Sequence, residues 1–155
     1  MDADDALALQ DALTDLMRVV QFRDRDRACC YDLSVSQCYG LRAVVQDGPL
    51  SVNDLAAHLV LDKSTASRLA GGLVDAGLVR KVRDPVDARA VRLEATGRGR
   101  AIHGGIAQDL AREYGSVLAD FSERERERVV EAVRRLAVAV ARRVDASGGR
   151  CCVVE

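Results

Sequence analysis

Small hydroxyl and basic side chains crowd one short stretch of the chain, the segment D-K-S-T-A-S-R that begins at Asp62. Asp62 is a favourable N-cap, so the residues after it would occupy the first turns of a helix. Hydroxyls bond to base edges or phosphates, Lys binds phosphate, and Arg can contact guanine through two hydrogen bonds. Such a helix has the chemistry to enter the DNA major groove. The residues expected to contact DNA there are Lys63, Ser64, Thr65, Ser67 and Arg68.

A basic hairpin is expected directly after this helix, because residues 78–95 contain two strand-like runs joined by a D-P-V-D turn. Arg83 and Arg89 flank the turn, and Asp87 lies where its carboxylate could orient the Arg89 guanidinium. A held arginine is suited to a narrow minor groove. We therefore expect all three residues to belong to the DNA-contacting set. The alternative is that Asp87 and Arg89 form a surface ion pair, which contributes little to stability.

Thiols form a second reactive set, since four of the five cysteines occur as the vicinal pairs Cys29-Cys30 and Cys151-Cys152. Thiolates are soft ligands that suit Cu(I), As(III), Hg(II), Cd(II) and Zn(II). Three thiolates without a nearby histidine favour As(III), Hg(II) or Cu(I) over tetrahedral Zn(II). No obligatory cofactor is expected; a soft metal or metalloid ion would act as an effector. Its candidate ligands are Cys29, Cys30, Cys38, Cys151 and Cys152.

Two other interpretations of the cysteines stay open. A thiolate at Cys29 or Cys30 could form a disulfide on oxidation, favoured by the arginines of the run at 23–27 and opposed by the aspartates among them. Cys38 considered alone falls on an apolar helix face, where a cysteine behaves as a small hydrophobe.

Composition narrows the class of protein. Of 155 residues, 48% are hydrophobic and only 3% aromatic, which favours helices packed through aliphatic side chains. Net charge is −1, yet residues 62–100 carry nine Lys or Arg against five Asp or Glu, which indicates local DNA contact.

No apolar run approaches the roughly 18 residues of a membrane span, and the acidic N-terminus does not resemble a signal peptide. We expect a cytoplasmic protein without a membrane partner, in which five cysteines do not build a disulfide framework.

Apolar spacing predicts a mainly α (α+β) fold in a single domain over residues 1–155. Within it we expect a winged helix-turn-helix over residues 34–96. Long helices at 5–30 and 97–145 would form the dimer interface. The tail 146–155, which contains two cysteines, is expected to be mobile. The last helix carries a near-heptad apolar seam, typical of a homodimer interface. The expected elements are helices over 5–27, from Ser34 or Ser36 to 47, over 52–59 and from Asp62 to 76, strands over 78–83 and 91–95, and helices from Thr96 and from Ser122, the last with Val129, Val133, Leu136, Val140 and Val144 on its seam.

Three segments in this order resemble the MarR family of regulators: LSVSQCYGLRAV, LSVNDLAAHLVLDKSTASRLAGGLVDAGLVRK and DPVDARAVRLEATGRG. The resemblance covers roughly residues 5–145. It implies a homodimeric winged-helix protein that binds a palindromic double-stranded operator, most often a repressor released by a small molecule, a metal or an oxidant. It adds a third interpretation of the effector, an organic ligand bound between helices.

Two positions depart from the family pattern. The first of two arginines common in the wing is Ala88 here, which removes one potential DNA contact. The expected recognition helix also contains Gly71 and Gly72, each costing roughly 1 kcal/mol relative to Ala inside a helix. Either close packing requires small residues there, or this helix is softer than usual.

Functions of other classes have less support. No Ser/His/Asp set, HExxH motif, phosphate-binding loop or dinucleotide fingerprint is present, and the two histidines leave little acid–base chemistry, so an enzyme is not expected. A winged-helix module that contacts only proteins is the remaining alternative. It would show no salt-dependent DNA binding.

Overall fold

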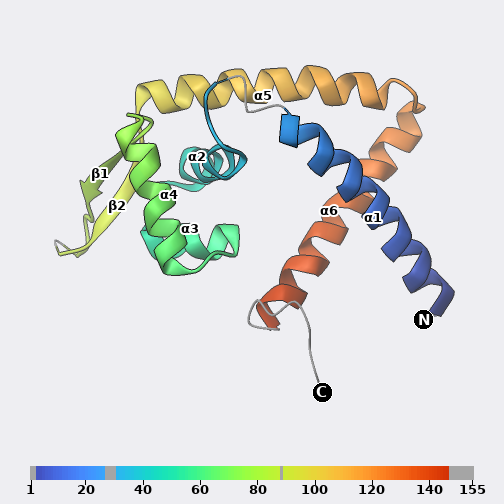
Figure 1. Cartoon of the computed structure of the whole chain (residues 1–155), viewed down its shortest axis with the longest axis horizontal. Helices are drawn as coiled ribbons and strands as arrows, with labels where there is room; N and C mark the ends of the chain where they lie inside the picture. The colour runs from blue at the N-terminus through green and yellow to red at the C-terminus, as the bar shows by residue number, and fades with distance from the viewer. Residues whose placement is uncertain (1–2, 27–30, 88, 147–155) are drawn as a thin grey trace. The chain divides into compact units, whose positions relative to one another are not determined.

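The computed structural model describes residues 3–26, 31–87 and 89–146, which form six α-helices and one two-stranded antiparallel sheet (Figure 1). The predicted mainly helical class is confirmed, and each predicted element is present within a few residues of its expected bounds. The elements are α1 (Ala3–Asp26), α2 (Val35–Asp47), α3 (Val52–Leu59), α4 (Lys63–Asp75), β1 (Val79–Arg83), β2 (Val91–Ala95), α5 (Gly97–Leu118) and α6 (Glu123–Ala146).

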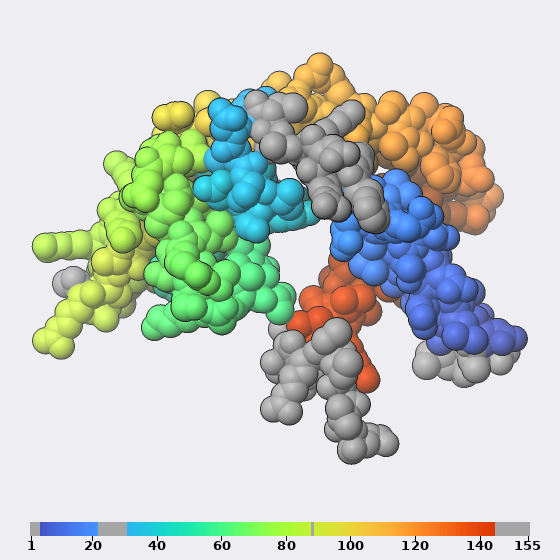
Figure 2. Space-filling model, in the orientation of Figure 1, coloured from blue at the N-terminus to red at the C-terminus, as the bar shows by residue number. Residues whose placement is uncertain are grey.

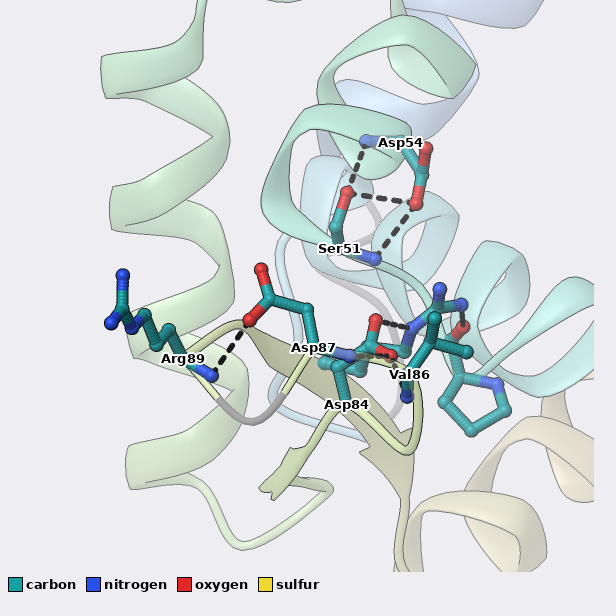
Figure 3. A network of polar contacts seen from close by, with 8 residues as sticks. Ser51, Asp54, Asp84, Val86, Asp87 and Arg89 are labelled. Atoms are coloured by element: carbon teal, nitrogen blue, oxygen red, sulfur yellow. Dashed lines mark hydrogen bonds and ion pairs between the residues drawn. The ribbon is translucent and has the colours of Figure 1, made fainter.

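Two consecutive helices begin with reciprocal serine caps. The Gln37 backbone N–H donates to the Ser34 hydroxyl at 3.2 Å, and the Ser34 N–H donates to the Gln37 side-chain oxygen at 2.9 Å. Ser51 and Asp54 repeat this exchange at the start of α3, at 3.1 and 2.9 Å (Figure 3). Each pair satisfies two backbone donors that a helix N-terminus leaves unbonded. The hydrogen bonds from Ser51 also lower the pKa of Asp54.

A small aliphatic core holds α2, α3, α4 and the sheet together. Within the described residues, every buried side chain is apolar. Burying one leucine contributes about 1.5–3 kcal/mol, so a few such side chains account for much of the stability of this region. The largest fully buried side chains are Leu41, Leu55, Leu73, Leu78, Val79 and Leu93.

Helix α4 faces this core along a narrow stripe. Ala66, Ala70 and Leu73 are buried there. Leu69 and Val74 are only half-buried. The buried positions follow an i, i+4, i+7 spacing, so these two side chains lie at the edges of the stripe.

The sheet is a hairpin with a third extended segment beside it. Val79 pairs with Ala95 and Arg83 with Val91 in an antiparallel register. Leu50 exchanges two backbone hydrogen bonds with Leu93, at 3.0 and 2.7 Å. A short extended piece before α3 therefore joins the α2–α3 connection to the hairpin.

One carboxylate closes the hairpin turn. The Asp84 Oδ2 atom accepts a hydrogen bond from Arg92 Nε at 2.5 Å, and Arg92 Nη1 donates to the Pro49 carbonyl at 3.1 Å. Asp84 Oδ1 accepts the backbone N–H groups of Val86, at 2.8 Å, and Asp87, at 3.2 Å (Figure 3). The Arg92 bond is the largest cause that lowers the pKa of Asp84, and the same bond raises the pKa of Arg92.

Helix α5 begins against the end of α4. Gly77 follows α4 with φ +70°, a left-handed conformation that glycine adopts readily at the end of a helix. The Thr96 N–H donates to the Leu78 carbonyl at 2.9 Å, and the Thr96 hydroxyl accepts the Gly99 N–H at 3.0 Å. A Cβ on Gly99 would lie 2.1 Å from the Leu78 oxygen. Only glycine therefore fits at this contact.

The two glycines of α4 differ in their surroundings. A Cβ on Gly71 would meet no atom within 4 Å, so packing does not require glycine there. A Cβ on Gly72 would lie 3.2 Å from Gln37 Nε2, the far end of a flexible side chain. Close packing therefore does not explain Gly71. The second expectation, a helix that is locally less stable, applies at this position.

The chain divides into two compact units, residues 1–104 and 105–155. In the second unit, the Glu125 carboxylate accepts the Ser122 N–H at 2.9 Å at the start of α6. Most of the predicted α6 seam is exposed, including Val133 at 55% and Val140 at 48%. Across the described part of the chain, none of the helices combines the length and the apolar character needed to cross a membrane.

We predict opposite effects of alanine at two glycines. Gly71→Ala should raise the free energy of unfolding by about 0.5–1 kcal/mol, because it removes backbone freedom from the unfolded chain without a clash. Gly99→Ala should lower it, because the new Cβ overlaps the Leu78 carbonyl. Urea denaturation followed by circular dichroism would measure both. A destabilised Gly71→Ala protein would show that the open space beside α4 is filled.

The hairpin turn should depend on pH through Asp84. Its pKa in the folded protein lies below the unfolded value of about 3.9, so the stabilisation is present above that value and is lost as the pH falls through the folded pKa. We expect the amide signals of Val86 and Asp87 to keep their positions down to about pH 4 and to shift below it, as followed by NMR. Asp84→Asn should remove this transition, whereas Glu94→Gln should retain it.

Candidate nucleic-acid interface

Helix α4 begins with a hydrogen-bond network centred on Asp62. Its carboxylate accepts the Thr65 N–H at 2.9 Å, the Ser64 hydroxyl at 2.5 Å and the Thr65 hydroxyl at 2.6 Å. Arg68 extends the network, because its Nη2 donates to Thr65 Oγ1 at 3.2 Å. The predicted N-cap is confirmed. The hydroxyls of Ser64 and Thr65, which the sequence assigned to DNA contact, are thus also bonded to this cap.

The network keeps Asp62 ionised. Its pKa is lowered far below the usual range, first by the Ser64 hydroxyl and then by the hydroxyl and the N–H of Thr65. The resulting anion lies at the positive end of the α4 dipole. An ionised carboxylate only accepts hydrogen bonds, so the protons of both hydroxyls are directed to Asp62.

The five residues of α4 predicted to contact DNA lie at its N-terminal end. Thr65 is half-buried beside the cap, and the other four are exposed: Lys63, Ser64, Ser67 and Arg68. Ser64 and Arg68 are one turn apart on the stripe opposite the buried Ala66 and Ala70. The helix therefore turns hydroxyl and guanidinium groups away from the core.

Helix α4 is held closely by α2. A Cβ on Gly40 would lie 3.1 Å from Leu69 Cδ2 and 3.2 Å from Leu73 Cδ1, so the α2 backbone approaches the α4 side chains closely. Close-packed contacts of this kind transmit small displacements. A change in the position of α2 would therefore displace the α4 side chains that it contacts.

The hairpin organises Arg89 differently from the sequence-based expectation. The Asp87 carboxylate accepts the backbone N–H of Arg89 at 2.9 Å, and the Arg89 side chain points away from it (Figure 3). Asp87 therefore shapes the chain at Arg89 and does not hold the guanidinium. The position of Ala88, the departure from the family pattern, lies outside the described residues.

The cations of the hairpin fall into two groups. Arg80 pairs with Glu94 at 2.6 Å across the strands, and Arg92 is bonded to Asp84. Arg83 and Arg89 are exposed and form no side-chain ion pair with any residue that the structure describes. In the space-filling view the hairpin projects beyond α3 and α4 (Figure 2).

Sequence reasoning missed the pair formed by Asp84 and Arg92, which builds the turn. Aspartate at the first position of a turn commonly accepts the N–H two residues on, so the D-P-V-D composition contained the signal for Asp84. Its partner was not visible, because Arg92 meets Asp84 only through the strand register.

Four of the five cysteines predicted to bind an effector ion, Cys29, Cys30, Cys151 and Cys152, lie outside the described residues. Cys38 lies half-buried on α2. Within the ranges described, no group of three His, Cys, Asp or Glu side chains could hold a metal ion. The convergence of thiolates therefore stays a prediction.

His58 has a structural partner. Its Nε2 atom lies 3.0 Å from the Asp47 carboxylate, so the imidazole joins α3 to the end of α2.

Comparison with known proteins shows which family this arrangement resembles. The MarR family model matches residues 31–90, from the start of the second helix region to the hairpin. The HTH-type transcriptional regulator YxaD of Bacillus subtilis (strain 168), itself uncharacterised, is 29% identical over 124 residues, which are 80% of this chain and 87% of that protein.

Solved structures match nearly the whole fold. A MarR family protein from Bacillus stearothermophilus superposes with a TM-score of 0.79 at 24% identity, covering 90% of this chain and 98% of the other. FabT of Streptococcus pneumoniae, solved in complex with DNA, gives a TM-score of 0.73 at 17% identity, covering 87% and 96%. Proteins of this family are regulators and not enzymes. The chain thus matches the MarR family model over residues 31–90 and shares the fold of solved MarR-family proteins.

Proposed function

We propose that this protein is a homodimeric repressor that binds a palindromic operator, with α4 in the major groove and the hairpin against the minor groove or backbone. The observation that carries the proposal is the exposed stripe at the start of α4, where Ser64 and Arg68 face away from the core. Beside it lies a hairpin with two arginines that pair with none of the described carboxylates. Hydroxyl and guanidinium groups read base edges, and arginine side chains also bind phosphates.

The charge distribution supports the same function. Residues 62–100 carry about +4, and two of the acids in this range are neutralised by ion pairs within the hairpin. The remaining cations lie on α4, on the hairpin and at the start of α5. A regulator with one basic region in a nearly neutral chain binds DNA through that region.

Dimerisation is supported by the apolar side chains of the terminal helices. In α1, Leu16 and Met17 are 55% and 52% exposed, and in α6 most of the valine seam is exposed as well. Apolar side chains that lie exposed together on a helix mark interaction sites. A second copy related by two-fold symmetry would also present two α4 helices to the two halves of a palindrome.

A solved neighbour supports the mode of binding. FabT has the same fold by its TM-score of 0.73 and was crystallised in complex with DNA. At 17% identity the likeness extends to the fold alone, so the contact residues of this chain are proposed from its own side chains: Lys63, Ser64, Thr65, Ser67, Arg68, Arg83, Asp87 and Arg89.

We also propose that a thiol-reactive effector releases the DNA, with a soft metal or metalloid ion bound by Cys29, Cys30, Cys38, Cys151 and Cys152 as the first candidate. Cys38 lies on α2, two residues before the Gly40 that packs against α4, so a ligand at Cys38 would act on the reading helix through a close contact. Oxidation of a cysteine, or an organic ligand between helices, would use the same route.

The DNA-binding proposal predicts a specific role for Arg89. Arg89→Ala should weaken operator binding roughly tenfold, the loss expected for one charge-assisted hydrogen bond. The slope of the logarithm of the binding constant against the logarithm of the salt concentration should fall in magnitude by about 1, because one phosphate contact is lost. Fluorescence anisotropy at several salt concentrations would measure both. Arg18→Ala removes the same charge from α1 and is the matched control. Equal losses in both variants would contradict the proposal, as would salt-independent binding, which would favour a protein-interaction module.

The effector proposal predicts release of operator DNA by one soft ion. The reduced protein should lose affinity about 5- to 150-fold, the usual range of allosteric coupling, on titration with As(III), Hg(II), Cu(I), Cd(II) or Zn(II). Cys29→Ser/Cys30→Ser should abolish the response, and Cys38→Ala should reduce it. Release only by peroxide would assign the trigger to oxidation. Release only by phenolic compounds would assign it to an organic ligand.

A further inference from the structure

We propose that Asp62 determines which bases α4 prefers, by committing the protons of the Ser64 and Thr65 hydroxyls so that both oxygens reach the operator as acceptors. The inference rests on the proposed docking of α4 in the major groove. It adds a specificity-determining residue that itself touches no base, because Asp62 acts through the two hydroxyls.

The hydrogen bonds around Asp62 define the direction of each proton. Ser64 Oγ lies 2.5 Å from Asp62 Oδ1, and Thr65 Oγ1 lies 2.6 Å from Oδ2, so each carboxylate oxygen holds one hydroxyl proton. Since a carboxylate cannot donate, no other direction satisfies both contacts. Ser64 keeps two lone pairs for other partners.

Thr65 has less capacity than Ser64. One of its two lone pairs receives Arg68 Nη2 at 3.2 Å, which leaves a single acceptor position. The same bond orients Arg68, a side chain that only donates. The start of α4 therefore presents acceptors at positions 64 and 65 and a donor one turn later at position 68.

Phosphate is a poor partner for these hydroxyls. Phosphate oxygens accept hydrogen bonds, so a hydroxyl could bond to them only after leaving Asp62, whose charge also repels an approaching phosphate. In the major groove, the donors are the N4 amino group of cytosine and the N6 amino group of adenine. Ser64 and Thr65 are thus suited to adenine or cytosine, whereas guanine O6 and N7 suit Arg68.

The test compares the base preference of the wild-type protein with that of Asp62→Asn by selecting operators from a randomised library. Asparagine caps a helix about as well as aspartate, so α4 should remain intact, as circular dichroism would confirm. Its amide group donates to one hydroxyl and releases that hydroxyl's proton toward the DNA. A preference of about five- to tenfold for adenine or cytosine at one base pair, the amount expected for one hydrogen bond, should fall below about twofold.

A second background separates action through the hydroxyls from direct contact by Asp62. In Ser64→Ala/Thr65→Val, the preference should already be lost, and adding Asp62→Asn should change it no further. If Asp62→Asn shifts the preference equally with and without the hydroxyls, Asp62 contacts the base itself and the inference is overturned. An unchanged preference in the single variant also overturns it, while operator binding by the wild type would still support the proposed function. Failure of the wild type to select any DNA would instead overturn the proposed function.

Discussion

The backbone N–H groups that remain unbonded at helix starts and turns govern where polar side chains lie in this protein. The described core is entirely aliphatic, so it contains no polar side chain that could bond these groups. An unsatisfied N–H costs free energy comparable to a lost hydrogen bond. Serine and aspartate side chains bond these groups at Ser34, Ser51 and Asp62, and Asp84 does so in the hairpin turn. The side chains that bond these backbone N–H groups therefore also form polar sites on the surface.

Asp62 and Asp84 bond backbone N–H groups and also lie in the surface that is proposed to face DNA. Asp62 completes the first turn of α4 and in doing so directs the hydroxyl protons of Ser64 and Thr65. Asp84 completes the hairpin turn and uses Arg92, so one of the basic side chains of the hairpin serves the fold. The local count of positive charge is therefore larger than the charge presented to a partner. Recognition of DNA depends on which cations remain available as much as on how many are present.

Close backbone contacts connect the same surface to the rest of the winged region. Gly99 lies against the Leu78 carbonyl, and Gly40 lies against two leucines of α4, so α2, α4 and the start of α5 leave little space for independent movement. Close packing passes on displacements, so the proposed effector at Cys38 would have a physical route from α2 to α4. In contrast, Gly71 is open on its outer side and leaves α4 locally less stable than alanine would.

Side-chain spacing and interactions within a few residues were enough to predict the order and type of the elements and the cap at Asp62. They left open whether Ser34 or Ser36 caps α2, and the structure has Ser34 in that position. Tertiary structure decided the pairings that join distant residues. Arg92 meets Asp84 and Pro49 through the strand register, and Leu69 lies at the edge of the core because of how α4 sits on α2. Asp87 bonds to the Arg89 backbone because the hairpin turn brings that N–H to its carboxylate. Local spacing cannot encode such contacts, since they arise only when separate elements pack together.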